Sequence, residues 1–287
     1  MSSAPARRAQ ITLGATTVTY LPDGFAELDP AKLFPAADWT AHPGHVDNGK
    51  LVLSLGSFLI RTAGRNILVD LGAGAVDLDH PTLGRLKSGA LLEHLAGEGL
   101  SRDDVDTVVY THLHRDHIGW TTGVSPFAGT PARNAANALT FHRAQHLLSE
   151  AEWRHWTEDP EPGGPSPELI LGPLKAAIRF VDDGETIAPG VRVLATPGHT
   201  PGHLAIAVED PSGQATESVL IVGDVLHSAA QISDSGMTFA TDVDPARART
   251  ARDRVLARPD TVLAAGHFTG TVFGNVVGDG HTWARCC

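Results

Sequence analysis

Cysteine, positive charge and long apolar runs are all scarce in this sequence. Only two of the 287 residues are cysteines, the adjacent Cys286 and Cys287 at the end of the chain. Neighbouring cysteines close a disulfide only with strain, and chain ends commonly fray. We therefore assign these two cysteines no role and look for the chemistry among other residue types.

Negative charge outweighs positive charge. Lys and Arg number 22 against 33 Asp and Glu, which gives a formal net charge of −11 at pH 7. A surface with this charge repels nucleic acids and anionic membranes, so we expect neither as a partner. The expected partner is a small molecule. Apolar loop residues such as Trp120 and Phe127 fit a substrate pocket or a homodimer contact equally well.

No apolar segment is long enough to target the chain or to anchor it in a membrane. Residues 1–10 are polar, so they lack the apolar core of a signal peptide. No later apolar run could span a bilayer. We expect a cytoplasmic protein with a disordered tail over residues 1–10.

The composition allows a substantial buried core. Hydrophobic residues make up 42% of the chain, and 30 residues are glycine. These values are compatible with one large α/β domain or with two small ones, and nothing indicates a second module. We expect a single domain over residues 1–287, in which residues 119–172 form a lid or an insertion.

Local patterns predict strands alternating with helices. Apolar and β-branched runs predict strands over residues 11–21, 51–60, 66–70, 108–111, 218–224 and 261–267, and a pair of strands within 179–193. Helical patterns occur over residues 84–96, 141–156 and 246–257. Residues 22–50 carry turn formers without a clear period, which predicts a long surface loop.

The last of these helices is rich in arginine. It carries Arg247, Arg249, Arg252 and Arg254, and Arg258 lies just beyond its end. Such residues could bind phosphates. Their spacing distributes them around the helix, however, so in an acidic protein we favour a solvated face with local ion pairs.

Three histidines and an aspartate occupy six consecutive positions after the strand predicted over residues 108–111. They are His112, His114, Asp116 and His117. In an extended segment His112 and His114 project to the same side, because side-chain direction repeats every two residues. Asp116 and His117 follow where the chain must turn, and can face a second cation. Imidazole and carboxylate at this spacing are ligands that zinc-type ions select.

Further candidate ligands end other predicted strands. His199 follows a Pro-Gly turn, Asp224 ends the apolar strand 218–224, and His267 ends the strand 261–267. A carboxylate at the end of a buried strand is costly unless it is paired or bound to a cation, so Asp224 indicates a metal close by.

Two other polar residues near these ligands have alternative roles. Asp70, at the end of the strand 66–70, either caps the following loop by accepting backbone N–H bonds or orients a metal-bound histidine. His203 belongs to the loop that already supplies His199, so we expect a packed, hydrogen-bonded histidine there rather than a ligand.

The segment His112-x-His114-x-Asp116-His117 resembles the signature of the metallo-β-lactamase superfamily, and the resemblance extends over most of the chain. It implies an α/β fold, the αββα sandwich of two mixed β-sheets flanked by helices. It also implies which residues bind which metal. The first metal is assigned His112, His114 and His199, the second Asp116, His117 and His267, and Asp224 lies between the two.

A dinuclear site of this kind implies hydrolysis. The expected cofactors are two divalent metal ions per chain, with zinc the best single choice and manganese, iron or cobalt also compatible with these ligands. Two such ions bring the pKa of a bound water toward neutrality and polarise the substrate, so a metal-bound hydroxide is the expected nucleophile. We expect Asp116 and Asp224 to act in catalysis as well as in metal binding.

Within the superfamily the sequence is most similar to the lactonase and methyl parathion hydrolase branch. The similarity rests on Thr196-Pro-Gly-His-Thr-Pro-Gly-His203, Gly223-Asp-Val-Leu-His-Ser-Ala-Ala230 and Ala264-Ala-Gly-His267. The resemblance also argues against a β-lactamase, because antibiotic-cleaving members generally lack the bridging aspartate that Asp224 provides here.

One position departs from the acyl-homoserine lactonases, which commonly have a tyrosine three residues after the bridging aspartate. Here His227 stands at that position. It is either a catalytic residue, as a proton donor or substrate contact, or a buried structural histidine.

We expect a hydrolase of small carboxylic esters or lactones, with phosphotriester hydrolysis as the nearest alternative. Further alternatives are a glyoxalase II-like thioesterase, a mononuclear-iron persulfide dioxygenase and a ligand-binding protein with a vestigial site.

Overall fold

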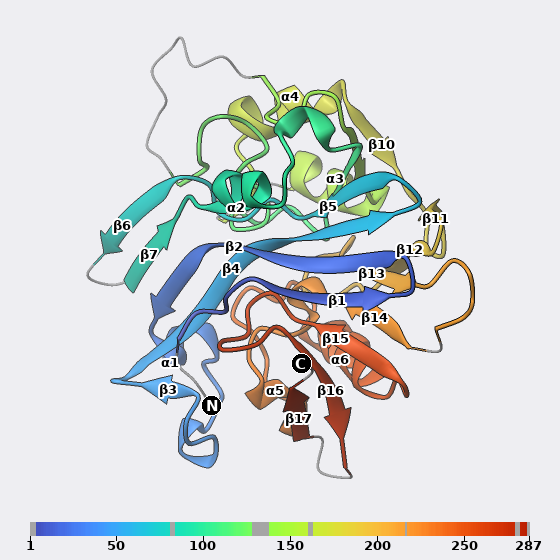
Figure 1. Ribbon diagram of the computed structural model, residues 1–287. Helices are drawn as coiled ribbons and strands as arrows, with labels where there is room; N and C mark the ends of the chain where they lie inside the picture. The colour runs from blue at the N-terminus through green and yellow to red at the C-terminus, as the bar shows by residue number, and fades with distance from the viewer. Residues whose placement is uncertain are drawn as a thin grey trace.

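Two β-sheets pack face to face, and helices cover their outer faces (Figure 1). The computed structural model describes residues 4–80, 84–127, 138–159, 163–215, 217–278 and 282–285. Each sheet contains both parallel and antiparallel pairs of strands. The predicted αββα sandwich of two mixed sheets is therefore confirmed.

The first sheet is built from the N-terminal part of the chain. Its strands are β1 (Ala9–Leu13), β2 (Thr16–Leu28), β3 (Val46–Asp47), β4 (Lys50–Thr62), β5 (Arg65–Val69), β6 (Val76–His80), β7 (Gly84–Ser88), β8 (Thr107–Val109), β9 (Gln145–Leu148) and β10 (Ile178–Phe180). The order is β10-β9-β8-β5-β4-β2-β7-β6, with β1 paired to β2 and β3 to β4.

The second sheet follows in the C-terminal part, with its strands in sequence order. They are β11 (Thr186–Ala188), β12 (Val191–Ala195), β13 (Leu204–Glu209), β14 (Ser218–Ile221), β15 (Thr261–Ala264), β16 (Phe273–Val277) and β17 (Thr282–Arg285). The α-helices are α1 (Pro30–Leu33), α2 (Leu91–Gly97), α3 (Glu150–Glu158), α4 (Gly172–Lys175), α5 (Ala230–Ser233) and α6 (Pro245–Leu256). Short 3-10 turns cover Trp39–Ala41, Arg102–Asp104 and Gly223–Val225, and a π-helical turn covers Pro167–Leu171.

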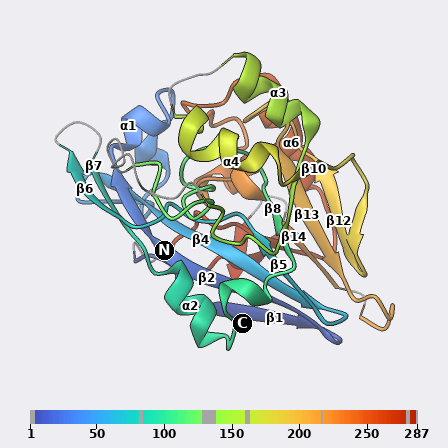
Figure 2. The same cartoon turned by 90° about the horizontal axis from the view of Figure 1, so that it is seen from above.

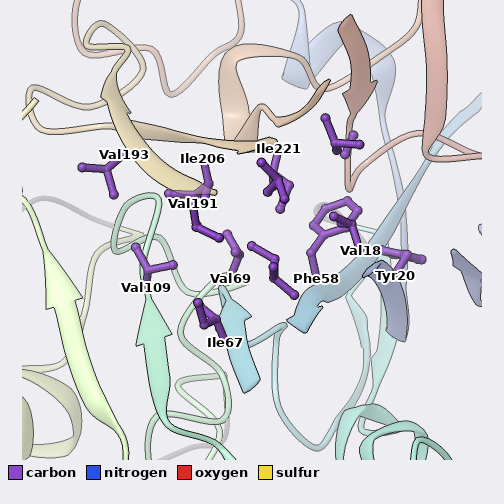
Figure 3. Packing of buried hydrophobic residues seen from close by; sticks show 14 of the residues in the cluster. Val18, Tyr20, Phe58, Ile67, Val69, Val109, Val191, Val193, Ile206 and Ile221 are labelled. Carbon is purple, nitrogen blue, oxygen red and sulfur yellow. The ribbon is translucent and has the colours of Figure 1, made fainter. Parts of the chain in front are cut away.

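Alternation along the strands divides the core into layers. Ile60 and Ile67 of the first sheet face Ile206 and Ile221 of the second in the layer between the sheets, part of which Figure 3 shows. Their neighbours Leu59 and Leu68 belong to the outer cluster, which also contains residues of α2 and α3. Figure 2 shows α2 beside β2 on this outer face. Because side chains alternate in direction, each strand can pack against both layers.

Several expected elements have different boundaries. The strand predicted over residues 11–21 is two strands, because the chain turns at Gly14 with a φ of +59°. The second of them, β2, runs on into the predicted loop 22–50 and pairs with β4 across a bulge between Pro22 and Gly24. The hydrogen bonds to the long strand β4 therefore keep these residues extended, although turn-forming residues occur among them.

Two predicted helices begin as strands. Within residues 84–96 the first five residues form β7, which pairs with β2 and β6, and only α2 is helical. Within residues 141–156, β9 lies between β8 and β10 in parallel pairing, and α3 starts at Glu150. Hydrogen bonds from neighbouring strands override the helical pattern at both places. The predicted helix 246–257 is confirmed as α6.

The predicted disordered tail over residues 1–10 is wrong for the part that the structure describes. Ala6 is buried and its N–H donates to Ser54 Oγ, Arg8 pairs with Glu98, and β1 begins at Ala9. Ser54 of β4 and Glu98, which follows α2, hold this segment in place. The two cysteines lie outside the described residues, as do residues 128–137 and 160–162 of the predicted lid.

Within the described ranges, no helix is long and apolar enough to cross a membrane. The cytoplasmic location and the homodimer contact stay predictions.

Candidate metal centre

Seven polar side chains converge at one edge of the two sheets. They come from four segments that each follow a strand: residues 112–117 after β8, His199 between β12 and β13, Asp224 after β14, and His267 after β15. The last three lie together because β13 runs antiparallel to β12 and β14, whereas β15 runs parallel to β14. The fold therefore gathers all seven residues that the sequence singles out as metal ligands.

His112, His114 and His199 form what we call the first donor group. His114 Nδ1 lies 2.9 Å from His112 Nε2 and 2.9 Å from His199 Nε2. Asp224 Oδ2 lies 3.4 Å from His112 Nε2 and 3.2 Å from His199 Nε2. Four potential ligand atoms therefore surround one point.

Asp116, His117 and His267 form the second donor group. The Nε2 atoms of His117 and His267 are 3.3 Å apart, and each lies 3.8 Å from Asp116 Oδ2. Asp224 Oδ1 lies 3.1 Å from His117 Nε2 and 3.0 Å from His267 Nε2. Asp224 thus turns one oxygen toward each donor group.

The chemistry of these donors fits divalent cations. Asp224 is only 4% exposed, yet within the described part of the chain its Oδ1 makes no hydrogen bond. The ring nitrogens of His117 and His267 beside this oxygen are themselves potential metal ligands. A buried carboxylate oxygen that faces them without a hydrogen bond is costly, and a cation bound between them would pair with it. Imidazole nitrogens and carboxylate oxygens are also the ligands that zinc and related ions select.

The electrostatics of the centre favour added positive charge. Burial disfavours the charge of Asp224, but the facing imidazoles of His117 and His267 hold its pKa well below the usual range. Burial also disfavours protonation of His199, yet the hydrogen bonds that its ring donates to the carboxylates of Asp224 and Asp242 raise its pKa to about 9. Burial lowers the pKa of His114 to about 3, so this ring is neutral, the form that binds metals.

Asp70 orients a candidate ligand histidine, the second of the two roles that the sequence left open, and the backbone N–H that it accepts belongs to Thr111 instead of the loop that follows β5. Its carboxylate accepts hydrogen bonds from the Thr111 N–H (2.7 Å) and the Thr111 hydroxyl (2.8 Å). Its Oδ2 also lies 2.8 Å from His117 Nδ1. The residue adopts a φ of +59° at the end of β5, a conformation that Asp tolerates better than most residues. Asp70 therefore fixes the ring of His117 so that its Nε2 faces the other two members of the second donor group.

Asp242 orients His199 in the same way, although no sequence pattern marks Asp242 as functional. His199 Nδ1 lies 2.9 Å from Asp242 Oδ1, and the Asp242 side chain is fully buried. Arg252 approaches Asp242 to 3.9 Å, and its guanidinium also donates to the carbonyl oxygens of Val225 and Met237. Arg252 is 1% exposed, so the prediction that it belongs to a solvated face is wrong.

Glu152 is a second residue that the sequence did not identify. It lies on α3, is fully buried, and accepts four hydrogen bonds. Oε1 accepts from the Leu113 N–H (3.0 Å) and Trp156 Nε1 (2.6 Å), and Oε2 accepts from the Thr200 hydroxyl (2.6 Å) and the Gly202 N–H (3.2 Å). Glu152 therefore ties the segment that carries His112 and His114 to the loop that carries His199. In the sequence, a glutamate three residues after Ser149 is typical of a helix N-terminus, which disguises this role.

His203 is packed and hydrogen-bonded, as predicted. It is fully buried, its Nδ1 lies 2.8 Å from the Thr196 hydroxyl, and its Nε2 accepts the Asp224 N–H at 3.0 Å. Its ring therefore supports the backbone of Asp224 and joins neither donor group.

His227 contacts the centre from the other side of Asp224. Its Nε2 lies 3.1 Å from Asp224 Oδ2, and its ring stacks on Phe239 at a centroid distance of 3.6 Å. Burial lowers its pKa to about 4, so the ring is neutral near pH 7 and Nε2–H donates to the carboxylate. Nδ1 is buried and makes no hydrogen bond to the described residues.

Two connected cavities open beside the second donor group. The smaller, about 210 Å³, is lined by His114, Asp116 and His227 among others. The larger, about 530 Å³, is mainly apolar, with Leu55 and Leu86 among its lining residues. Both cavities include the side chains of Leu53, Arg115, Asp116 and Phe127. An apolar group of a bound small molecule can therefore lie in the larger cavity while the reactive carbon or phosphorus of the same molecule lies beside the donor groups.

Comparisons with known proteins agree with this geometry. The family model described as Metallo-beta-lactamase superfamily matches residues 57–267. The N-acyl homoserine lactonase AiiA of Bacillus thuringiensis subsp. kurstaki is 27% identical over 238 residues, which cover 76% of this chain and 83% of that protein.

Solved structures share the fold. AidC, a dizinc quorum-quenching lactonase solved in complex with a product, has a TM-score of 0.81 at 21% identity and covers 100% of this chain and 99% of its own. The hydrolase AbOPH in the beta lactamase superfamily has a TM-score of 0.76 at 24% identity, covering 97% and 96%. The family model matches well over half of the sequence, so this chain belongs to the metallo-beta-lactamase superfamily.

Proposed function

We propose that this metallo-beta-lactamase superfamily hydrolase opens small carboxylic esters or lactones, with two divalent cations held by the two donor groups and Asp224. Zinc is the proposed metal. The observation that carries the proposal is the position of Asp224, whose two buried oxygens each face one donor group.

The side chains divide the chemical tasks among themselves. When bound, divalent cations lower the pKa of a water molecule toward neutrality and polarise the carbonyl group of the substrate. Asp116 is the carboxylate of the centre best placed to move a proton to the leaving oxygen, because its side chain is 29% exposed and lines both cavities. His227 holds Asp224 Oδ2 in position through its Nε2–H.

The apolar cavity indicates the substrate class. It is large enough for an alkyl or aryl group and lies directly beside Asp116. The curated relatives include N-acyl homoserine lactonases, whose substrates join an acyl chain to a lactone. An ester or lactone with an apolar substituent therefore suits both the cavity and the relatives.

The test combines metal analysis with a substrate panel. Elemental analysis of the purified protein should give about two metals per chain. The panel should hold aryl esters, γ- and δ-lactones, a homoserine lactone, a phosphotriester and a glutathione thioester, and the proposal expects the highest kcat/KM for an ester or a lactone. One iron per chain, oxygen consumption with a persulfide and an inert ester panel would instead identify an oxygenase.

Phosphotriester hydrolysis is the second candidate. It is favoured by His227, because an imidazole stands where the acyl-homoserine lactonases have a tyrosine hydroxyl, and this ring is buried against Phe239. A kcat/KM for methyl parathion above that for every lactone and ester of the panel would establish this candidate in place of the first.

A further inference from the structure

A separate cavity of about 480 Å³ lies between α6 and the second sheet. Its floor is apolar and includes Leu194 of β12, Leu220 of β14 and Val255 of α6. Leu220 and Val255 belong to the buried cluster between α6 and this sheet. None of the seven donors of the metal centre lines the cavity, so it is distinct from the two cavities beside Asp116.

Three arginines surround this apolar floor. Arg247 and Arg254 are seven residues apart and so lie on one face of α6, and Arg258 follows two residues after the end of the helix. All three are exposed, and none of their guanidinium groups makes an ion pair or a hydrogen bond to a described residue. Asp183 also lines the cavity, and its Oδ1 accepts the Ala195 N–H at 2.7 Å.

The other two arginines of this region have different partners. Arg249 does not line the cavity and lies 3.8 Å from Asp253 in an exposed ion pair. Arg252 is buried beneath Asp242. The sequence-based interpretation of a solvated arginine face therefore holds for Arg249, whereas Arg247, Arg254 and Arg258 line a cavity that offers them no counter-charge beyond Asp183.

The unbalanced charge of this cavity is unusual for the protein that contains it. The chain carries a net charge of −11, yet three unpaired guanidinium groups gather around one hollow. Guanidinium groups bind carboxylates and phosphates in a bidentate way, and the apolar floor would accept a hydrocarbon chain. The volume lies within the range of about 300–1,000 Å³ typical of small-molecule sites.

We propose that this cavity binds a small amphipathic anion, a carboxylate or phosphate head group on a short alkyl chain. The head group lies against Arg247, Arg254 and Arg258, and the chain lies on Leu194, Leu220 and Val255. Thr196 and Pro197 also line the cavity, and they belong to the loop that carries His199. An occupant would thus contact the back of this loop without reaching the metal centre.

The test uses the metal-loaded full chain with methyl-labelled leucine and valine. Octanoate, octyl phosphate, octanol and inorganic phosphate are titrated separately, and the methyl resonances of Leu194, Leu220 and Val255 are followed by NMR. Octanoate or octyl phosphate should shift these resonances in a saturable way, and the preferred one identifies the head group. Octanol and inorganic phosphate should each bind at least about tenfold more weakly, because each lacks one of the two contacts.

Variants of exposed arginines supply the second measurement. The double variant Arg247→Gln/Arg254→Gln should weaken binding of the amphipathic anion about tenfold. Arg249→Gln on the same helix should leave the affinity unchanged, and both variants should hydrolyse esters at the wild-type rate. Equal affinity for octanol, equal affinity for inorganic phosphate, or unchanged binding by the double variant would each overturn the proposal.

Discussion

The two donor groups differ in what they face and in how they are held. The first consists of three imidazoles, with His112 and His199 almost completely buried. The second contains Asp116, whose side chain is 29% exposed and lines both cavities. A buried group of neutral ligands suits a cation that is simply held in place, whereas a group with an accessible carboxylate suits a cation that meets the substrate. We therefore expect metal binding by the two groups to change differently when the residues that hold their ligands in place are substituted.

Asp224 is common to both groups, so its removal should have the largest effect. We expect Asp224→Ala to lower ester or lactone hydrolysis by about a thousandfold or more, because both groups lose a charged ligand at once. Elemental analysis should show fewer than two metals per chain. The control is Asp253→Asn, an exposed aspartate on α6 that pairs with Arg249. Retained hydrolysis in Asp224→Ala would show that the bridging assignment is wrong.

Glu152 supports the first group only, and its loss should appear mainly in stability. Each of its oxygens accepts two hydrogen bonds, so in Glu152→Gln the amide NH2 must face two donors whichever way it is turned. We expect the free energy of unfolding to fall by about 2–4 kcal/mol, measured by urea denaturation. Glu150→Gln on the same helix, exposed and paired with Arg154, should change it by less than about 0.5 kcal/mol. Equal values for the two variants would contradict the role of Glu152.

Asp70 and Asp242 allow a direct comparison of the two groups. Asp70→Asn removes the charge behind His117, and Asp242→Asn removes the charge behind His199. Loss of such a carboxylate typically weakens metal binding about 10- to 100-fold. During dialysis against increasing chelator, each single variant should therefore lose one of the two metals early, and the double variant should lose both. Loss of both metals together in each single variant would show that the groups are not independent.

The donors and Asp70 could be predicted from the sequence, whereas Asp242 and Glu152, which hydrogen-bond to the donors or to their loops, could not. His112, His199, Asp224 and His267 each follow an apolar strand, and strand ends at one edge of a sheet are brought together by the fold. Asp242 has no such marker, because it lies in an irregular segment and reaches His199 only through tertiary packing. For the same reason local patterns identified the strands β4 and β5, which pair with each other, but not β7 and β9, whose strand pairing competes with a helical pattern.

His227 should give the smallest effect, since it contacts Asp224 without belonging to either group. His227→Phe keeps an aromatic ring against Phe239 but removes the hydrogen bond to Asp224 Oδ2. A hydrogen bond to a charged group contributes about 1.5–3 kcal/mol. Because the metals still hold Asp224, we expect only about a tenfold fall in kcat, with KM and metal content nearly unchanged. Phe239→Leu, which removes the stacking partner and keeps the hydrogen bond of His227 to Asp224, is the matched control. If His227→Phe keeps the full kcat and Phe239→Leu does not, the ring of His227 acts by packing and its nitrogen atoms take no part in catalysis.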